Sequence, residues 1–101
     1  MDILTIRKKI AAGNFNIVDH ALTEAFKDGI SVNDIIYCIN NGKIIETYPS
    51  RKRCLIFSML NLDIPLHVAV DYSSEEIDIM TAYIPDSRSW IKFQIRKRGK
   101  K

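Results

Sequence analysis

The sequence predicts an α+β fold in which N-terminal helices pack on a roughly four-stranded antiparallel meander sheet. Two observations predict it. Up to Gly42, apolar residues recur at the three- and four-residue spacing of helices. After Gly42, four runs rich in β-branched and aromatic residues follow one another through short turns. Consecutive strands with short connections pair antiparallel, so the helices are expected to cover one face of a single sheet.

The composition describes a single globular domain. The chain has 101 residues, of which 47% are hydrophobic and 27% charged, enough for one apolar core. Residues 92–101 carry six basic side chains and no acid, whereas residues 1–91 carry a net charge of −3. We therefore expect a domain over residues 1–95 and a basic, disordered tail over residues 96–101. Such a tail either binds phosphate groups non-specifically or only aids solubility.

The cysteines and the hydropathy pattern predict a cytoplasmic protein. Cys38 and Cys54 are far apart and form no CxxC pair. The N-terminus, MDILTIRKKIAAG, lacks the continuous apolar segment of a signal peptide, and no run of about 20 apolar residues is present to span a membrane. We expect reduced thiols and no membrane partner.

Three helices are predicted before Gly42. The first covers residues 2–12, with Asp2 as its N-cap. The second covers about residues 20–28, with Asp19 as its N-cap and Gly29 as the left-handed residue that ends it. Its buried stripe is expected to consist of Ala21, Leu22, Ala25 and Phe26. Between these two helices, the apolar FNIV segment is short enough to be extended.

The third helix and the strands have clear sequence boundaries. Ser31 and Asp34 have the spacing of a capping box, and NNG at residues 40–42 ends the helix. The expected strands are KIIETYP, RCLIFSML, LHVAVDY and IDIMTAYI. The segment PDSRSWIKF after them is predicted to be either a turn with a short helix or an extended arm.

The two histidines are the candidates for acid–base chemistry, because histidine titrates near neutral pH. His20 is expected at about the first position of its helix, where the helix dipole favours a neutral imidazole and free backbone N–H groups favour an anion. His67 is expected on the more polar face of its strand, opposite Val68. The alternative for both is a purely structural role.

Hydroxyl and basic residues complete the set of candidates. Thr81 and Tyr83 share one face of the last strand, and Arg53 opens a strand directly after Arg51 and Lys52. The alternatives are strand-forming propensity for the hydroxyl residues and protection of a sheet edge for the cations. No sequence motif indicates a metal or cofactor site.

The order of these features resembles the domain-of-unknown-function family 4258. The resemblance is carried by DHALTEAFKDGISVNDIIYCINNGKIIETYP, by an arginine that opens a strand, and by PLHVAVD and IMTAYIPD, and it covers about residues 17–90. Relatives commonly have a basic residue in an RGI-like element. This chain has DGI instead, with Lys27 one residue earlier.

Such domains are similar to the RelE/BrnT-like toxins and to the wider microbial ribonuclease fold. The resemblance implies a toxin-like, metal-independent endoribonuclease of the mRNA-interferase kind that uses histidine acid–base chemistry and no cofactor. It also implies RNA as a partner, on the ribosome or free, and a cognate antitoxin; a homodimer is a further expectation. The catalytic positions that it implies are His20, Arg53, His67, Thr81 and Tyr83.

A mechanism follows from these positions as a hypothesis. One neutral histidine takes the proton of a ribose 2′-hydroxyl. The other histidine, which is protonated, donates a proton to the leaving 5′-oxygen. Arg53 stabilises the phosphorane, and Thr81 or Tyr83 orients a phosphate oxygen. The expected nucleic-acid contacts are Arg51, Lys52, Arg96, Lys97 and Arg98. Two alternatives remain: a non-catalytic module of the same fold that binds nucleic acid or protein, and an idle member that serves only self-association.

Overall fold

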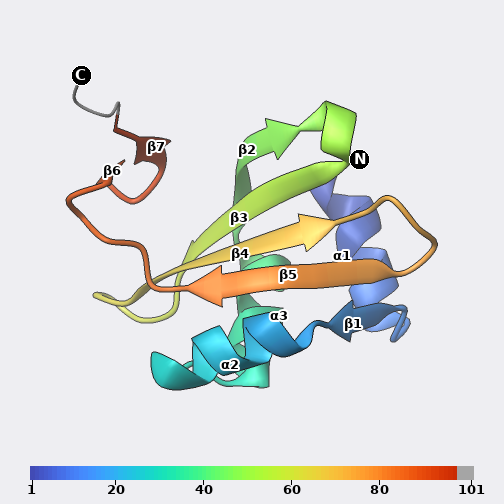
Figure 1. Cartoon of the computed structure of the whole chain (residues 1–101), viewed down its shortest axis with the longest axis horizontal. Helices are drawn as coiled ribbons and strands as arrows, with labels where there is room; N and C mark the ends of the chain where they lie inside the picture. The colour runs from blue at the N-terminus through green and yellow to red at the C-terminus, as the bar shows by residue number, and fades with distance from the viewer. Residues whose placement is uncertain (98–101) are drawn as a thin grey trace.

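The computed structural model describes residues 1–97, and Figure 1 shows its three helices beside one main sheet. The elements follow the chain as α1 (Ile3–Ala11), β1 (Phe15–Ile17), α2 (Asp19–Lys27), α3 (Val32–Asn41), β2 (Lys43–Tyr48), the 3-10 turn η1 (Pro49–Arg51), β3 (Arg53–Met59), β4 (Pro65–Asp71), β5 (Ile77–Tyr83), β6 (Trp90–Ile91) and β7 (Ile95–Arg96).

The main sheet has five strands in the order β1-β5-β4-β3-β2. Strands β2 to β5 are antiparallel neighbours in chain order, as predicted, but β1 adds a parallel strand beside β5. The predicted four-stranded meander is therefore wrong as a description of the whole sheet, although the α+β class is confirmed. The three residues of β1 pair with residues more than 50 positions later in the chain. A local sequence pattern does not predict such a contact.

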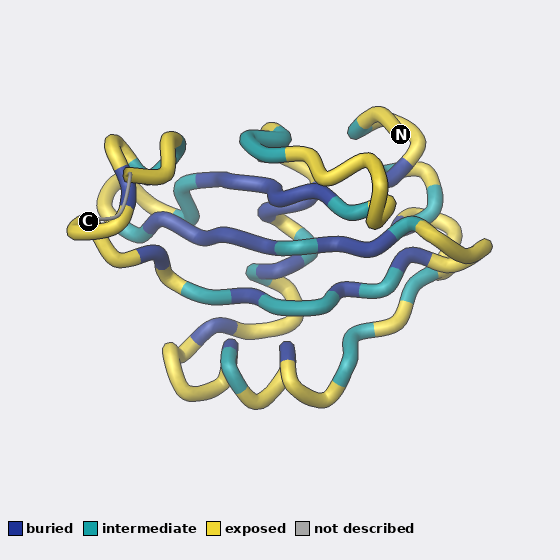
Figure 2. The backbone as a smooth tube through the Cα atoms, turned by 45° about the horizontal axis from the view of Figure 1, so that its top comes forward, coloured by how far each residue is buried: buried dark blue, intermediate teal, exposed yellow. Residues whose placement is uncertain are grey.

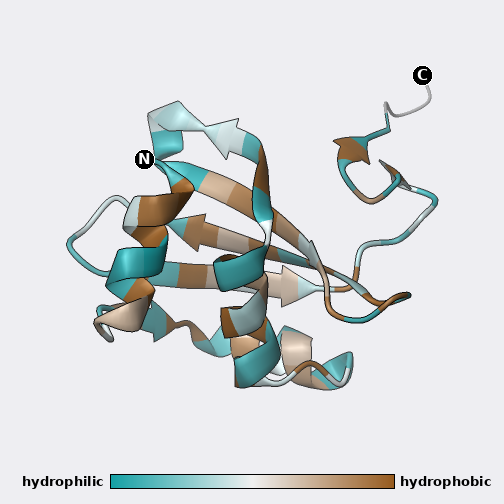
Figure 3. Cartoon of the chain, turned by 180° about the vertical axis from the view of Figure 1, so that it is seen from behind, coloured by the Kyte–Doolittle hydropathy of each residue, from teal (hydrophilic) through white to brown (hydrophobic). Residues whose placement is uncertain are grey.

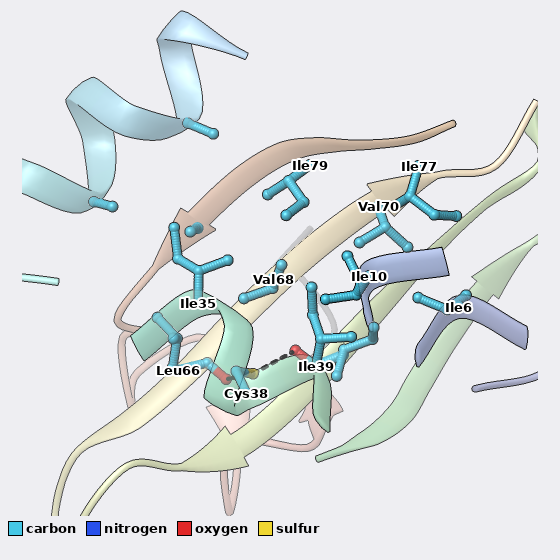
Figure 4. Packing of buried hydrophobic residues seen from close by; sticks show 14 of the residues in the cluster. Ile6, Ile10, Ile35, Cys38, Ile39, Leu66, Val68, Val70, Ile77 and Ile79 are labelled. Atoms are coloured by element: carbon cyan, nitrogen blue, oxygen red, sulfur yellow. Dashed lines mark hydrogen bonds between the residues drawn. The ribbon is translucent and has the colours of Figure 1, made fainter. Parts of the chain in front are cut away.

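The helices cover only one face of this sheet. Seen from behind, α1 and α3 lie across the strands (Figure 3), while α2 lies along β5. The core between the layers includes Ile35 and Ile39 of α3 and Val68 of β4, all fully buried (Figure 4). The Cys38 thiol, also in this layer, donates to the backbone carbonyls of Ile56 and Leu66.

The helix boundaries follow the predicted signals with one exception. Asp2 caps α1 by accepting from the Thr5 amide, as predicted. Asp19, however, is the first residue of α2, and the N-cap is Val18, which makes no side-chain cap hydrogen bond. The prediction of Asp19 as N-cap is therefore wrong, and His20 lies one position further into the helix than expected.

The predicted buried stripe of α2 is also half wrong. Ala21 and Ala25 are buried, but Leu22 is 39% and Phe26 84% exposed. The small side chains of Ala21 and Ala25 let the helix lie close to β5, and the larger side chains of Leu22 and Phe26 remain exposed at the edge of the contact. A helical repeat of apolar residues identifies a face, but it does not reveal how much of that face the chain covers.

The connection between α2 and α3 follows the sequence closely. Gly29 has a φ of +74°, the left-handed conformation expected of a residue that ends a helix. Ser31 and Asp34 form the predicted capping box. After α3, Gly42 fits because a Cβ atom there would lie 2.3 Å from the Phe57 carbonyl oxygen, closer than any neighbour allows.

The chain ends in a small separate hairpin of β6 and β7, shown at one end of the main sheet in Figure 1. Residues 85–93 were predicted to form a turn with a short helix or an extended arm, and β7, which lies just beyond them, was not predicted. Arg96 belongs to β7, which corrects the predicted start of a disordered tail at this residue. Arg98 lies outside the described residues. Within residues 1–97, no helix is long and apolar enough to cross a membrane.

Candidate functional site

The face of the sheet opposite the helices carries polar and aromatic side chains in three cross-strand rows. Alternation along the strands places these residues away from Val68 and the main core. Running from β2 to β5, the rows are Lys43, Phe57, His67 and Tyr83; then Glu46, Leu55, Ala69 and Thr81; then Tyr48, Arg53, Asp71 and Asp78. Figure 2 shows how far the central strands are nevertheless buried. The core-facing residues of these strands lie under the helices, and on the opposite face the C-terminal hairpin covers His67 of the first row.

His20 lies beside a pair of hydrogen bonds that joins α2 to β5. Its Nε2 atom is 3.9 Å from Oε1 of Glu24, one helical turn further along, and the His20 side chain is 73% exposed. The Thr81 hydroxyl and the Ala82 amide donate to the same Glu24 oxygen. Strand β1 ends opposite Ile79, so beyond that point Glu24 takes the place of a strand partner at the edge of β5. An exposed histidine, a carboxylate and a strand hydroxyl therefore lie together at this edge.

His67 is on the predicted face but is fully buried. Its Nε2 atom is 2.6 Å from the Phe93 carbonyl oxygen, and its Nδ1 atom is 3.2 Å from the Tyr83 hydroxyl. A carbonyl only accepts, so Nε2 carries the proton and Nδ1 accepts from Tyr83. Burial lowers the pKa of His67, although the Phe93 carbonyl and Glu46 act in the opposite direction. The closed hairpin thus engages both ring nitrogens of His67, and burial favours its neutral form.

Side chains hold the hairpin over this histidine. The Trp90 ring meets the His67 ring edge-on, with centroids 4.4 Å apart. The Arg96 guanidinium lies 4.5 Å from the Trp90 ring centroid and donates to both carboxylate oxygens of Glu46, at 3.0 and 3.2 Å. Burial acts to raise the pKa of Glu46, but hydrogen bonds from Arg96 and Tyr48 outweigh it and lower the pKa.

Arg53 occupies the third row, next to Asp71. Its Nε–H donates to Asp71 at 2.8 Å, and its side chain is 42% exposed. Hydrogen bonds from Ser73 and Arg53 lower the pKa of Asp71, which keeps this carboxylate charged. Among residues 1–97, the two terminal nitrogens of Arg53 have no hydrogen-bond partner, so they remain able to bind an anion.

The structure places the five predicted catalytic residues in two groups and one outlier: four of them lie on the sheet face opposite the core, and His20 lies on α2 at the edge of β5. His20 and Thr81 meet through Glu24, while His67 and Tyr83 are bonded directly. The two groups are adjacent, because Thr81 and Tyr83 are two residues apart on β5, about 7 Å. Arg53 lies on β3, two strands away from β5, in the third row.

The predicted nucleic-acid contacts lie at two ends of this face. Arg51 and Lys52 are exposed at the turn before β3, and Arg96 and Lys97 are exposed on the hairpin. Arg96 is already paired with Glu46. No group of three or more histidine, cysteine, aspartate or glutamate side chains arranged to hold a metal ion occurs among residues 1–97.

Sequence reasoning missed three residues that organise the site: Glu24, Glu46 and Trp90. Glu24 had a visible signal, since it stands four residues after His20 on a predicted helix and therefore on the same face. Glu46 and Trp90 had none, because their role depends on how the hairpin folds back over the sheet.

Comparison with known protein families identifies the family of this chain. The model of the family described as "Domain of unknown function (DUF4258)" matches residues 17–84. The chain belongs to this family. The match runs from the end of β1 to the residue after β5, and so includes both polar groups on β5 but not the hairpin. No curated protein and no solved structure matches the chain significantly.

Proposed function

We propose that this member of the DUF4258 family is a toxin-like, metal-independent endoribonuclease that cleaves RNA by histidine acid–base chemistry. The observation that carries the proposal is the meeting of His20, Glu24 and Thr81 at the exposed edge of β5. The likeness to RelE/BrnT-like toxins, the RNA substrate and the antitoxin partner rest on the sequence resemblance.

His20 is the general base of the proposed reaction. It is well exposed, and the Glu24 carboxylate beside it stabilises the imidazolium that forms when His20 takes the proton of a ribose 2′-hydroxyl. Glu24 is fixed in turn by Thr81 and by the backbone of β5. A carboxylate that is itself held by the sheet therefore lies 3.9 Å from His20, where it can balance the charge that the histidine gains during general-base catalysis.

Arg53 supplies positive charge on the sheet face that carries Thr81. Attack by the 2′-oxygen creates a phosphorane with additional negative charge, which a guanidinium with free terminal nitrogens stabilises. Arg51 and Lys52 precede it at the exposed turn and extend the basic surface along the RNA backbone. His67 is the proposed acid for the leaving 5′-oxygen. This role requires Nε2 to part from the Phe93 carbonyl and Nδ1 to take up a proton from solvent, so that the imidazolium can donate the Nε2 proton to the 5′-oxygen.

The second candidate is a non-catalytic RNA-binding module of the same fold. The observation that favours it is the closed hairpin, which leaves His67 neutral and buried. In that case the polar face and the basic residues bind RNA, and no bond is cleaved.

Incubation of the purified chain with single-stranded RNA in EDTA separates the two candidates. We expect cleavage by the wild type, and a loss of at least about 100-fold in rate for His20→Ala. The matched control is Asp19→Ala, an exposed neighbour on α2 outside the contact between Glu24 and Thr81. A salt-dependent gel shift without cleavage would favour the binding module, and a chain that neither cleaves nor binds RNA would refute both.

A further inference from the structure

The C-terminal hairpin contacts the candidate site in the manner of a bound ligand. It forms its own two-stranded sheet, and its contacts with the main sheet are made through one backbone carbonyl and a few side chains. It also lies outside the 17–84 region that matches the family. This chain therefore adds its own cover to a face that the family domain presents.

The contacts that the hairpin makes are those that single-stranded RNA makes with proteins. The Trp90 indole meets the His67 ring edge-on, and His67 in turn contacts Phe57 and Tyr83, so Trp90 borders an aromatic cluster against which a planar base can also pack. The Phe93 carbonyl accepts from His67 Nε2, as an oxygen of RNA would. The Arg96 guanidinium lies over the Trp90 ring, 4.5 Å from its centroid.

The hairpin carries backbone strain at the point of this contact. Lys92 and Phe93 are adjacent non-glycine residues with φ values of 52° and 62°. They are the central residues of the turn closed by the Gln94 amide and the Ile91 carbonyl. Asn-Gly is the usual choice at such a pair, because most side chains disfavour positive φ. The strained turn points the Phe93 carbonyl at His67, and strain of this kind concentrates at switches and ligand clamps.

We propose that the hairpin is a pseudosubstrate: Trp90 and the Phe93 carbonyl occupy, in cis, a nucleobase-binding subsite and the oxygen position at His67 Nε2, and single-stranded RNA displaces them. This inference rests on the proposed function and adds to it the substrate form, an unpaired strand, and a means of restraint within the chain. Base-paired RNA has its bases stacked internally and offers none to the subsite.

Substitution of Glu46 weakens the attachment of the hairpin and keeps all of its basic side chains, which could themselves bind RNA. Glu46→Gln breaks the ion pair and leaves Arg96 in place. Asp86→Asn is the matched control, because it also removes one carboxylate from an arginine pair, that with the exposed Arg88, away from the sheet face. Phe93→Gly relieves the positive φ and is expected to hold the hairpin more firmly closed.

Trp90 reports opening directly, since it is the chain's single tryptophan and is 4% exposed. The probe is a short single-stranded RNA with 2′-O-methyl groups, which binds but cannot undergo 2′-hydroxyl attack. Its addition should shift Trp90 emission to the red and increase quenching by acrylamide. Glu46→Gln should bind it about fivefold more tightly than the wild type, Asp86→Asn should match the wild type within about twofold, and Phe93→Gly should bind more weakly.

Two results would overturn the proposal, and they are distinguishable. If filter retention detects RNA binding while Trp90 emission and quenching stay unchanged in the wild type and in Glu46→Gln, RNA binds elsewhere, and only the pseudosubstrate role fails. If Glu46→Gln exposes Trp90 but neither protein binds or cleaves RNA, the proposed function fails together with the subsite. Equal affinity for a duplex of the same sequence would refute the requirement for unpaired bases.

Discussion

The bond between Thr81 and Glu24 gives the most detailed test of the site's geometry. The perturbation is a double-mutant cycle of Thr81→Val and Glu24→Ala, read as the free energy of unfolding in urea. Thr81→Val keeps the shape of the side chain and deletes the hydroxyl. Glu24→Ala deletes the acceptor of both Thr81 and the Ala82 amide at the strand edge.

The magnitudes follow from the contacts and from exposure. A hydrogen bond to a charged group contributes about 1.5–3 kcal/mol, and because the Glu24 side chain is 33% exposed we expect the lower end. Thr81→Val should therefore cost about 1.5 kcal/mol, and Glu24→Ala about 2 kcal/mol because it also leaves the Ala82 amide without an acceptor. The coupling energy should be about 1 kcal/mol. His20→Ala, at an exposed position, should change stability by less than about 0.5 kcal/mol.

A coupling energy below about 0.3 kcal/mol would refute this reasoning, because the two side chains would then be stabilised independently. The same outcome would remove the structural reason for placing His20 and Thr81 in one site. Equal costs for His20→Ala and Glu24→Ala would also contradict it, since they would show that the carboxylate acts mainly through the histidine.

Three further predictions concern the remainder of the chain. Burial lowers the pKa of His67, so the unfolded chain takes up a proton first as pH falls. The free energy of unfolding should therefore be highest above about pH 6.5 and should decline as the pH falls below it. His67→Gln should lack this decline in urea titrations, and an equal decline in both proteins would contradict the assignment. Ala25→Ser should lower the free energy of unfolding by about 1–3 kcal/mol, because it buries a hydroxyl. Phe26→Ser, at an 84% exposed position, should change it by less than about 0.5 kcal/mol. Similar costs for the two variants in thermal melts would refute the observed placement of α2. Burial raises the pKa of Cys38 to about 12 and of Cys54 to about 11, so neither thiol should react with a thiol reagent at neutral pH until the chain is unfolded, and rapid labelling of the native chain would contradict this.

The sequence predicted those parts of the fold that depend on local chemistry. The Asp2 cap, the Ser31 and Asp34 capping box and the left-handed Gly29 follow from which backbone groups a helix end leaves free. The antiparallel order of β2 to β5 follows from short connections. The parallel strand β1 could not be predicted in this way, because its partner in β5 lies far along the chain.

The candidate site was predicted as a set of residues but not as an arrangement. Alternation along β4 and β5 correctly placed His67, Thr81 and Tyr83 on one face. It did not predict that Trp90 and Phe93 would return to bury His67, which depends on tertiary contacts of a segment with weak strand propensity. Exposure, unlike orientation, is a property of the whole fold.

The central claim is that this chain cleaves RNA by attack of a 2′-hydroxyl from which His20 removes the proton. The most direct measurement compares two single-stranded RNAs of one sequence in EDTA, one with ribose throughout and one with a 2′-O-methyl group at the position before the scissile bond, using the Glu46→Gln chain to present the site open. The account predicts cleavage of the ribose substrate alone, a 2′,3′-cyclic phosphate on the product, and a loss of at least about 100-fold when His20→Ala is added. Cleavage of both substrates, or an unchanged rate without His20, would contradict it.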